Sequence, residues 1–155
     1  MSAPQNLEMV HATAVAIGQS GVLIIGKSGS GKSDLALRLI DRGATLISDD
    51  IVQVDGTAVP PTLHPAANIA GKIEIRGVGI TFAPHVEDIP LRLVVNLDAM
   101  VERLPSGRQA HSTAGFDIPT INLVAFEASA PIKIEYALCS LVDAAIFPVA
   151  TQSPA

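Results

Sequence analysis

Eight consecutive residues, Gly26-Lys27-Ser28-Gly29-Ser30-Gly31-Lys32-Ser33, satisfy the pattern G-x-x-x-x-G-K-[ST] of phosphate-binding loops. The glycines let backbone N–H groups approach phosphate oxygens without a Cβ in the way. A helix beginning near Lys32 would present free N–H groups and its positive dipole end to the same anion. Lys32 would carry a full charge to the outer phosphates, and the Ser33 hydroxyl is placed to bind Mg²⁺. The segment therefore predicts a site for a nucleoside triphosphate with magnesium.

A glycine-rich turn is the alternative interpretation of these eight residues. The segment follows an apolar stretch typical of a strand and opens an amphipathic stretch typical of a helix. That is the structural context in which the pattern binds phosphate, so we favour the phosphate site.

Triphosphate chemistry also needs acidic groups, which hold the metal and orient or deprotonate the nucleophile. Asp49-Asp50 follows the apolar Leu46-Ile47, and Asp98 follows the apolar residues 93–97. The hydrophobic pattern alone favours Asp98 as a second metal-binding position. The adjacent pair has a different merit, because close like charges favour the protonated form of one acid, which suits a proton acceptor. A turn or a helix cap explains the pair equally well.

Three further polar residues are candidates for the same site. His11 falls in a predicted strand antiparallel to the one that feeds the loop, although a lone strand histidine is more often structural. Glu74 opens the stretch EIRGVGI (residues 74–80), which is either a site loop or a solvated turn. Arg103 either supplies charge to a transition state or is simply exposed.

The elements that must position these residues follow from the hydrophobic pattern. Val10–Ile17 and Val22–Ile25 are apolar and β-branched, and residues 18–21 between them contain two glycines, which predicts a hairpin. Residues 32–42 predict a helix with one apolar face, ending before Gly43.

Beyond this helix the expected elements are mostly strands. We expect strands at residues 45–47, 51–54, 73–75, 91–97 and 121–126, loops at 60–65 and 106–115, and a closing helix at 132–146. This order predicts an α/β mixed sheet with few helices, not a regularly alternating doubly wound fold.

Length and composition limit the protein class. The 155 residues predict a single domain over residues 1–155, with an ordered core from about residue 7 to 148. A net charge of -5 argues against a nucleic-acid partner, whose binding surface is usually basic. The first six residues lack the features of a signal peptide, and no apolar run is long enough to cross a bilayer. We therefore expect a cytoplasmic protein with no membrane association.

The order and spacing of Gly26–Ser33, Arg42-Gly43, Ser48-Asp49-Asp50 and residues 74–80 resemble the catalytic domain of HPr kinase/phosphorylase. The EIRGVGI stretch looks like the signature of that family and is far more specific than the phosphate loop. The resemblance covers roughly residues 8–125 and indicates a short form with the C-terminal catalytic domain only.

The resemblance implies a fold related to phosphoenolpyruvate carboxykinase, with a phosphate loop in a mixed sheet. It implies ATP-dependent phosphorylation of a serine on HPr, the small phosphocarrier protein of the sugar phosphotransferase system. Family members also run a phosphorolysis, in which inorganic phosphate removes the serine phosphate and pyrophosphate is released. The family tends to form hexamers, so a homo-oligomer is expected.

Residue by residue, the resemblance makes Asp49 the proton acceptor from the serine, and the proton donor in reverse, with His11 assisting. Ser33, Asp50 and Glu74 would hold Mg²⁺, and the loop of residues 26–33 would hold ATP.

The resemblance supports a role for Arg103 and does not support one for Asp98. Arg103 would act on the transferring phosphoryl group or in phosphorolysis. Asp98 is not a motif residue of the family, so the resemblance favours Asp49-Asp50 over the choice made from the hydrophobic pattern.

Two other functions remain open from the sequence. The later Gly-Arg-Asn element of the family is missing near residues 127–130, which would suit a module that senses ATP or phosphate with little turnover. A small-molecule kinase would need an arginine-rich lid, and only Arg103 and Arg108 fall near the predicted loop.

Overall fold

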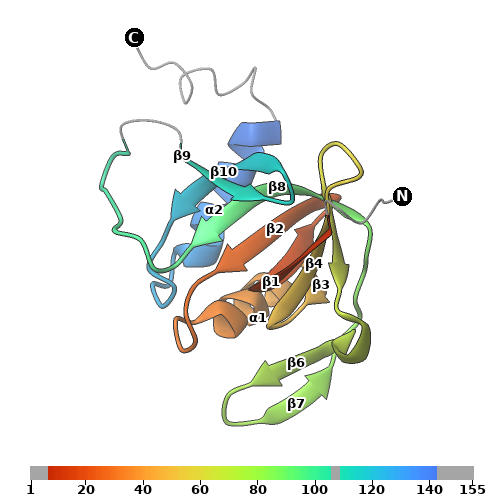
Figure 1. Ribbon diagram of the computed structural model, residues 1–155. Coiled ribbons are helices and arrows are strands. Elements are labelled where there is room, and N and C mark those ends of the chain that lie inside the picture. Colours follow the sequence, from red (N-terminus) through yellow and green to blue (C-terminus); the bar gives the residue numbers. More distant parts are fainter. Residues whose placement is uncertain (1–6, 106–108, 143–155) are drawn as a thin grey trace.

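The computed structural model of the chain describes residues 7–105 and 109–142 (Figure 1). The strands of this part of the chain are β1 (Leu7–Ile17), β2 (Ser20–Ile25), β3 (Thr45–Ser48), β4 (Ile51–Asp55), β5 (Thr62–Pro65), β6 (Lys72–Ile75), β7 (Gly79–Phe82), β8 (Ile89–Asn96), β9 (Gln109–Thr113) and β10 (Phe116–Asn122). The helices are α1 (Lys32–Asp41), α2 (Ala130–Val142) and the short 3₁₀ helix η2 (Ala67–Ile69).

Most of the described strands form one mixed sheet in the order β2-β1-β4-β5-β8-β10-β9, with β3 paired to β1. Because β2 also pairs with β8, the strands β2, β1, β4, β5 and β8 close into a ring. β6 and β7 form a separate hairpin that projects from the ring (Figure 1). The predicted mixed α/β fold with few helices is confirmed, while the relation to phosphoenolpyruvate carboxykinase stays a prediction.

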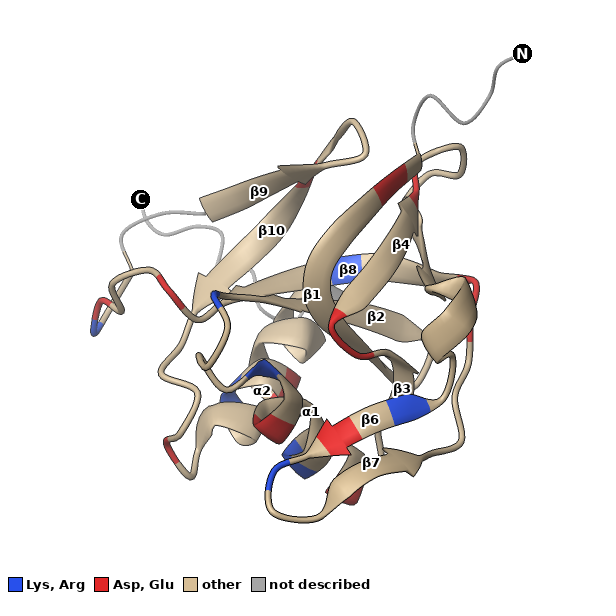
Figure 2. Cartoon of the chain, turned by 60° about the horizontal axis from the view of Figure 1, so that its bottom comes forward, with Lys and Arg blue, Asp and Glu red and all other residues tan. Residues whose placement is uncertain are grey.

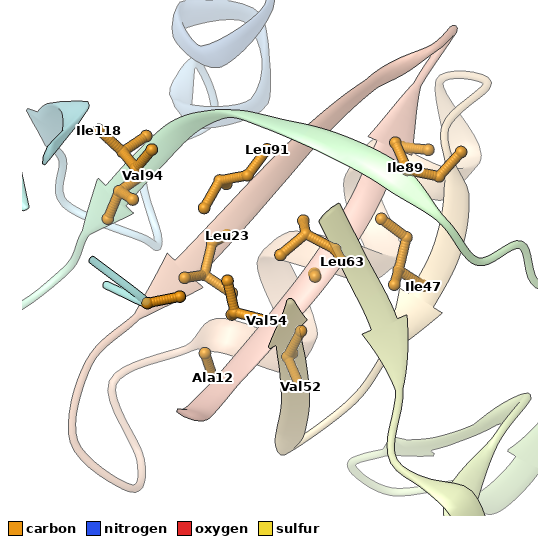
Figure 3. Packing of buried hydrophobic residues seen from close by; sticks show 13 residues of the cluster. Ala12, Leu23, Ile47, Val52, Val54, Leu63, Ile89, Leu91, Val94 and Ile118 are labelled. Atoms are coloured by element: carbon orange, nitrogen blue, oxygen red, sulfur yellow. The ribbon is translucent and has the colours of Figure 1, made fainter. Parts of the chain in front are cut away.

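Apolar side chains form two cores, one on each face of β2 and β8. Successive side chains of a strand point to opposite faces, so Leu23 and Val94 lie in the core inside the ring, with Leu63 of β5 (Figure 3). Their neighbours Ile24 and Val95 lie in the other core, which the two helices cover. The helix residues of that core are Leu35, Ala36 and Leu39 of α1 and Ala130, Ile134 and Leu138 of α2. The ring thus holds β2 and β8 rigidly between two packed layers.

Helix α1 ends within one residue of the prediction, and glycines with positive φ flank it. Gly31 precedes the helix with φ of 103°, and Gly43 follows it with φ of 113°. These values lie in the left-handed region, which glycine adopts without a steric penalty. The predicted hairpin at residues 10–25 is also confirmed, and its first strand begins earlier, at Leu7.

Three predicted elements are wrong. The sequence predicts a loop at residues 60–65, yet Thr62–Pro65 is β5, which pairs with both β4 and β8. Within the predicted loop at 106–115, Gln109–Thr113 is β9, paired with β10. The strand expected at 121–126 lies earlier, at Phe116–Asn122. In each case hydrogen bonds to a neighbouring strand override a weak local propensity, because strand formation depends on the partner.

The closing helix is confirmed as α2, beginning at Ala130, two residues before its expected start. Residues 143–148 of the expected helix and ordered core lie outside the described residues. None of the helices in residues 7–105 and 109–142 combines the length and apolar composition that a membrane span requires.

Candidate active site

The 26–33 loop begins where the parallel ladder between β2 and β8 ends. Ile25 pairs with Asn96, and the Leu97 N–H then donates to the Ile25 carbonyl over 2.9 Å. One residue further, the Asp98 carboxylate accepts a hydrogen bond of 2.8 Å from the Lys27 N–H. The Asp98 side chain is therefore bonded to the backbone of the loop, and this contact follows directly after the last backbone hydrogen bond between β2 and β8.

Close contacts within the loop explain its glycines. A Cβ on Gly26 would lie 2.5 Å from the Ser30 Oγ and 3.2 Å from the Leu97 Cβ, so a larger residue there would displace these side chains. The Lys32 ammonium group donates to the carbonyls of Gly26 (2.8 Å) and Lys27 (3.1 Å). The loop thus curls around the charged end of Lys32, which is only 7% exposed.

The loop has the unsatisfied donors that a polyphosphate requires. No side chain caps the N-terminus of α1, so the first N–H groups of the helix have no capping partner. The Ser30 Oγ is buried and has no hydrogen-bond partner within the described chain. Together with the Lys32 charge, these groups fit an anion with several oxygens at the start of a helix.

The Asp49-Asp50 pair interrupts two short strands that both run along β1. Ala14 of β1 pairs with Ser48 of β3, and His11 of β1 pairs with Ile51 of β4. Between them, Asp50 has φ of 74°. This left-handed residue breaks the alternation of the strand, so each carboxylate meets its own set of partners.

Asp49 is buried and joins three elements. Its Oδ1 accepts hydrogen bonds from the Ser33 Oγ (2.6 Å) and the Thr13 Oγ1 (3.0 Å). Its Oδ2 accepts one from the Glu74 N–H (3.1 Å). Asp49 is only 6% exposed. The residue therefore ties the 26–33 loop to β1 and β6, and Figure 2 shows the β3–β4 turn close to β6.

Asp50 is open to solvent and pairs with the predicted histidine. Its Oδ1 lies 2.9 Å from the His11 Nε2, and the two side chains are 68% and 54% exposed. Carboxylate and imidazole at this distance form a unit that can accept and hold a proton. The pairing differs from the expectation, in which His11 assists Asp49.

These groups meet at one pocket of about 410 Å³, here called the loop pocket. Its lining residues are Ser28, Gly29, Gly31, Lys32, Ser33, Asp34, Leu37, Asp50, Glu74, Ile75, Arg76 and Phe126. Asp50 lines this pocket and Asp49 does not. The volume lies within the usual range for small-molecule sites, about 300–1,000 Å³. A ligand in the loop pocket would therefore contact the loop, Asp50 and β6 together.

The oxygen donors around Ser33 fit a magnesium ion. The Ser33 hydroxyl and the carboxylates of Asp50 and Glu74 belong to the loop pocket. Within residues 7–105 and 109–142, no three His, Cys, Asp or Glu side chains gather as a preformed metal cage. Mg²⁺ is commonly held by one or two carboxylates together with substrate phosphates and water, which is the kind of site these residues provide.

Arg103 is not brought to the loop pocket. It lines a second pocket of about 380 Å³, together with Gln109 and Lys133. The structure thus gathers the loop, His11, Asp49, Asp50 and Glu74 through hydrogen bonds and the pocket lining, and places Arg103 elsewhere.

Sequence reasoning missed several residues of the site, among them Arg76, Thr13 and Phe126. Arg76 lines the loop pocket, and its place in the same stretch as Glu74 was a usable signal. Thr13 supports Asp49, and its position two residues after His11 on β1 points it to the same face. Phe126 also lines the pocket, but no motif marks it.

Comparisons with known proteins identify the family of the chain. The family described as HPr Serine kinase C-terminal domain matches residues 4–153. HPr kinase/phosphorylase of Lacticaseibacillus casei (strain BL23) is 34% identical over 151 residues, covering 88% of this chain and 44% of the relative. The same-named protein of Chlorobium phaeovibrioides is 32% identical over 133 residues, covering 77% of this chain and 40% of the relative. The chain therefore spans less than half the length of these relatives.

A solved structure described as the Hpr(Ser) kinase/phosphatase from Coxiella burnetii superposes with a TM-score of 0.72. It is 25% identical, and the match covers 92% of each chain. The sequence match, the relatives and the shared fold confirm the resemblance seen in the motifs, and the chain belongs to the HPr serine kinase C-terminal domain family.

Proposed function

We propose that this protein is an ATP-dependent kinase that phosphorylates a serine of an HPr-type phosphocarrier protein, and that it also catalyses phosphorolysis of the product. The observation that carries the proposal is the composition of the loop pocket. A single cavity joins Lys32 and Ser33 of the 26–33 loop to Asp50, which is paired with His11. Phosphoryl transfer needs such a combination of an anion cradle and an acid–base group.

The contacts favour exchanging the expected roles of the two aspartates. A proton acceptor must reach the serine hydroxyl within hydrogen-bond distance. Asp50 is exposed in the loop pocket and can do so, while both oxygens of Asp49 are engaged by protein donors. We therefore propose Asp50 as the acceptor, with His11 orienting its carboxylate, and Asp49 as the residue that holds Ser33.

The other groups of the pocket support the same reaction. Lys32 and the N–H groups at the start of α1 bind and orient the triphosphate, as a P-loop does. Mg²⁺ held by Ser33 with Glu74 would neutralise charge on the outer phosphates. Arg76 adds a further cation to the lining.

The test is phosphotransfer to HPr. Purified protein is incubated with labelled ATP, Mg²⁺ and HPr from the same organism, and the labelled residue is identified. We expect label on a serine. Asp50→Asn should lower the transfer rate about 100- to 10,000-fold, the usual contribution of a general base. Asp41→Asn, an exposed change on α1 outside the pocket, is the matched control.

Three outcomes would contradict parts of the proposal. Tight ATP binding without transfer would indicate the sensing module instead, and label on a small molecule would indicate a metabolite kinase. Full activity of Asp50→Asn with loss in Asp49→Asn would return the acceptor role to Asp49.

The reverse reaction has its own assay, with inorganic phosphate and serine-phosphorylated HPr as substrates and pyrophosphate as the product. Arg103 lines the second pocket, and its role in phosphorolysis is proposed from the resemblance alone. Arg103→Ala should slow pyrophosphate release more than it slows the forward transfer, and an equal effect on both directions would contradict that role.

A further inference from the structure

One aromatic side chain stands at the edge of the loop pocket. Phe126 lies on the segment that joins β10 to α2, and it is 66% exposed. Single exposed apolar residues are normal and need no explanation by themselves. Phe126 differs from the other exposed aromatics of the described chain, Phe82 and Tyr136, because these two do not line that pocket.

The backbone around Phe126 is fixed by one guanidinium group from α1. Arg38 donates through Nη2 to the Ala125 carbonyl and through Nη1 to the Glu127 carbonyl, the latter over 3.1 Å. The same side chain donates through Nε to Asp34 over 3.0 Å. Both neighbours of Phe126 are therefore anchored to the helix that begins at the 26–33 loop. Because the segment is short and anchored on both sides of Phe126, this side chain is preorganised.

The tip of the Phe126 ring touches the loop itself. A Cβ built on Gly31 would lie 2.9 Å from the Cζ and 3.2 Å from the Cε1 of Phe126. The tip of the ring therefore lies next to the backbone of Gly31, where a Cβ would clash with it. Because the residue is still 66% exposed, most of the ring surface remains open beside the site where phosphates would bind.

The strand order indicates which part of a nucleotide would reach this ring. β8 pairs in parallel with β2 on one side and with β10 on the other. The carboxyl ends of the three strands therefore lie in a row, with the 26–33 loop after β2 and Phe126 four residues after the end of β10. Asp50 and Glu74 belong to β1-side elements, across the loop from β10. A nucleotide with its outer phosphate at Asp50 would extend its base toward Phe126.

We propose that Phe126 is the platform on which the base of the bound nucleotide stacks, and that Arg38 holds this platform in position. The inference rests on the proposed function, since it assumes that the 26–33 loop binds the phosphates. Stacking of a base on an aromatic side chain contributes about 1–3 kcal/mol, which corresponds to about a 5- to 150-fold change in affinity.

The test compares two ligands that share the phosphates and differ in the base. Calorimetry measures the dissociation constants of ATP and of inorganic triphosphate, both with Mg²⁺. Phe126→Ala and Phe126→Leu should weaken ATP binding about 5- to 150-fold and leave triphosphate binding unchanged, while Phe126→Tyr should retain both. Phe82→Ala, which removes a similarly exposed ring outside the pocket, should change neither.

The outcomes separate this inference from the proposed function. An equal loss for both ligands would show that the ring only braces the loop, and unchanged ATP binding in Phe126→Ala would show that the base does not meet it. Either result overturns the inference and leaves the phosphate site standing. If wild-type protein binds neither ligand, the proposed function fails as well.

A fluorescence measurement gives an independent readout, because the chain contains no tryptophan. In Phe126→Trp, ATP should quench the indole emission and inorganic triphosphate should not. Tyr136→Trp places the same probe at an exposed position of α2 outside the loop pocket, where no quenching is expected. Quenching of Phe126→Trp by triphosphate as strongly as by ATP would overturn the stacking assignment.

Discussion

At the scale of single residues, burial decides what each carboxylate can do. Asp49, Asp50 and Asp98 all follow apolar segments, and the chain pattern does not distinguish their roles. In the structure, Asp49 is buried among three donors, Asp50 faces solvent beside His11, and Asp98 holds the Lys27 N–H. Only an acid with an accessible oxygen can take a proton from a substrate, which favours Asp50 for that step.

The contact of Asp98 predicts an effect on anion binding. Asp98→Ala removes the acceptor of the Lys27 N–H and should weaken triphosphate binding about 2- to 12-fold, from a hydrogen bond of about 0.5–1.5 kcal/mol. Asp98→Asn keeps an acceptor oxygen and should bind at least as tightly as the wild type, since it also removes a negative charge near the anion. Calorimetry with inorganic triphosphate measures both. Equal losses in the two variants would contradict the positioning role.

A second residue-scale prediction concerns pH. The Thr57 hydroxyl and N–H both donate to the Asp55 carboxylate and lower the pKa of Asp55 below its ordinary value of 3.8. A depressed pKa in the folded protein contributes stability above the unfolded value, and this contribution is lost as the pH falls through the folded pKa. Thr57→Ala should raise the pKa of Asp55 toward 3.8, and Thr57→Ser should not. Carboxyl NMR titration measures the shift, and an unchanged value in Thr57→Ala would contradict the assignment.

At the scale of elements, helix α1 organises the site from both of its ends. Its first turn belongs to the loop pocket, and Arg38 in its last turn holds the segment that carries Phe126. Beyond the helix, Arg42 forms two hydrogen bonds with Glu135 of α2, of 2.9 and 2.7 Å, and these raise the pKa of Arg42. The pair is exposed, so its contribution to stability is small. Its consequence is orientation, because it aligns α2 against α1.

Two glycines of the loop provide a matched test of its geometry. Gly31 and Gly29 both have positive φ, but a Cβ would clash only at Gly31, with Ala125 (2.8 Å) and Phe126 (2.9 Å), and would meet nothing at Gly29. Gly29→Ala should therefore cost about 1–3 kcal/mol of backbone strain, while Gly31→Ala should also displace the loop and abolish measurable ATP binding. Urea unfolding and calorimetry measure the two effects. Equal ATP affinities in both variants would show that the contact is not tight.

At the scale of the whole molecule, the closed ring explains how a chain with few aromatics builds a stable core. Aromatic residues are 3% of the sequence, so aliphatic side chains from the strands of the ring, with Ile47 of β3 and Ile118 of β10, fill the interior (Figure 3). The same closure fixes the carboxyl ends of β2 and β8 relative to the middle of β1, so the 26–33 loop lies beside His11 and the β3–β4 turn. Oligomer formation, expected from the family, stays a prediction that light scattering can test.

The ring core predicts a large effect of cavity formation. Leu63 is fully buried, so Leu63→Ala should lower the free energy of unfolding by about 2–5 kcal/mol. Leu104→Ala changes a residue that is 82% exposed and should alter the free energy of unfolding by less than about 0.5 kcal/mol. Urea denaturation measures both, and a small effect at Leu63 would mean that the ring relaxes around the missing side chain.

The sequence by itself determined the parts of this protein that depend on local chemistry. Short stretches of sequence specify the 26–33 loop, the hairpin before it and helix α1, and short motifs identify the family. Glycine spacing, hydrophobic period and such motifs each depend on only a few neighbouring positions. The strands β5 and β9 could not be found in this way, since their hydrogen-bond partners are distant in the chain.

Only the tertiary structure decided how the candidate residues are combined. The antiparallel register of β1 with β4 brings His11 to Asp50, and the burial of Asp49 directs its carboxylate to Ser33. Parallel pairing of β10 with β8, with the Arg38 anchor, brings Phe126 to Gly31. These are contacts between segments far apart in the sequence, and their geometry is set by strand pairing and packing, which no local pattern of residues specifies.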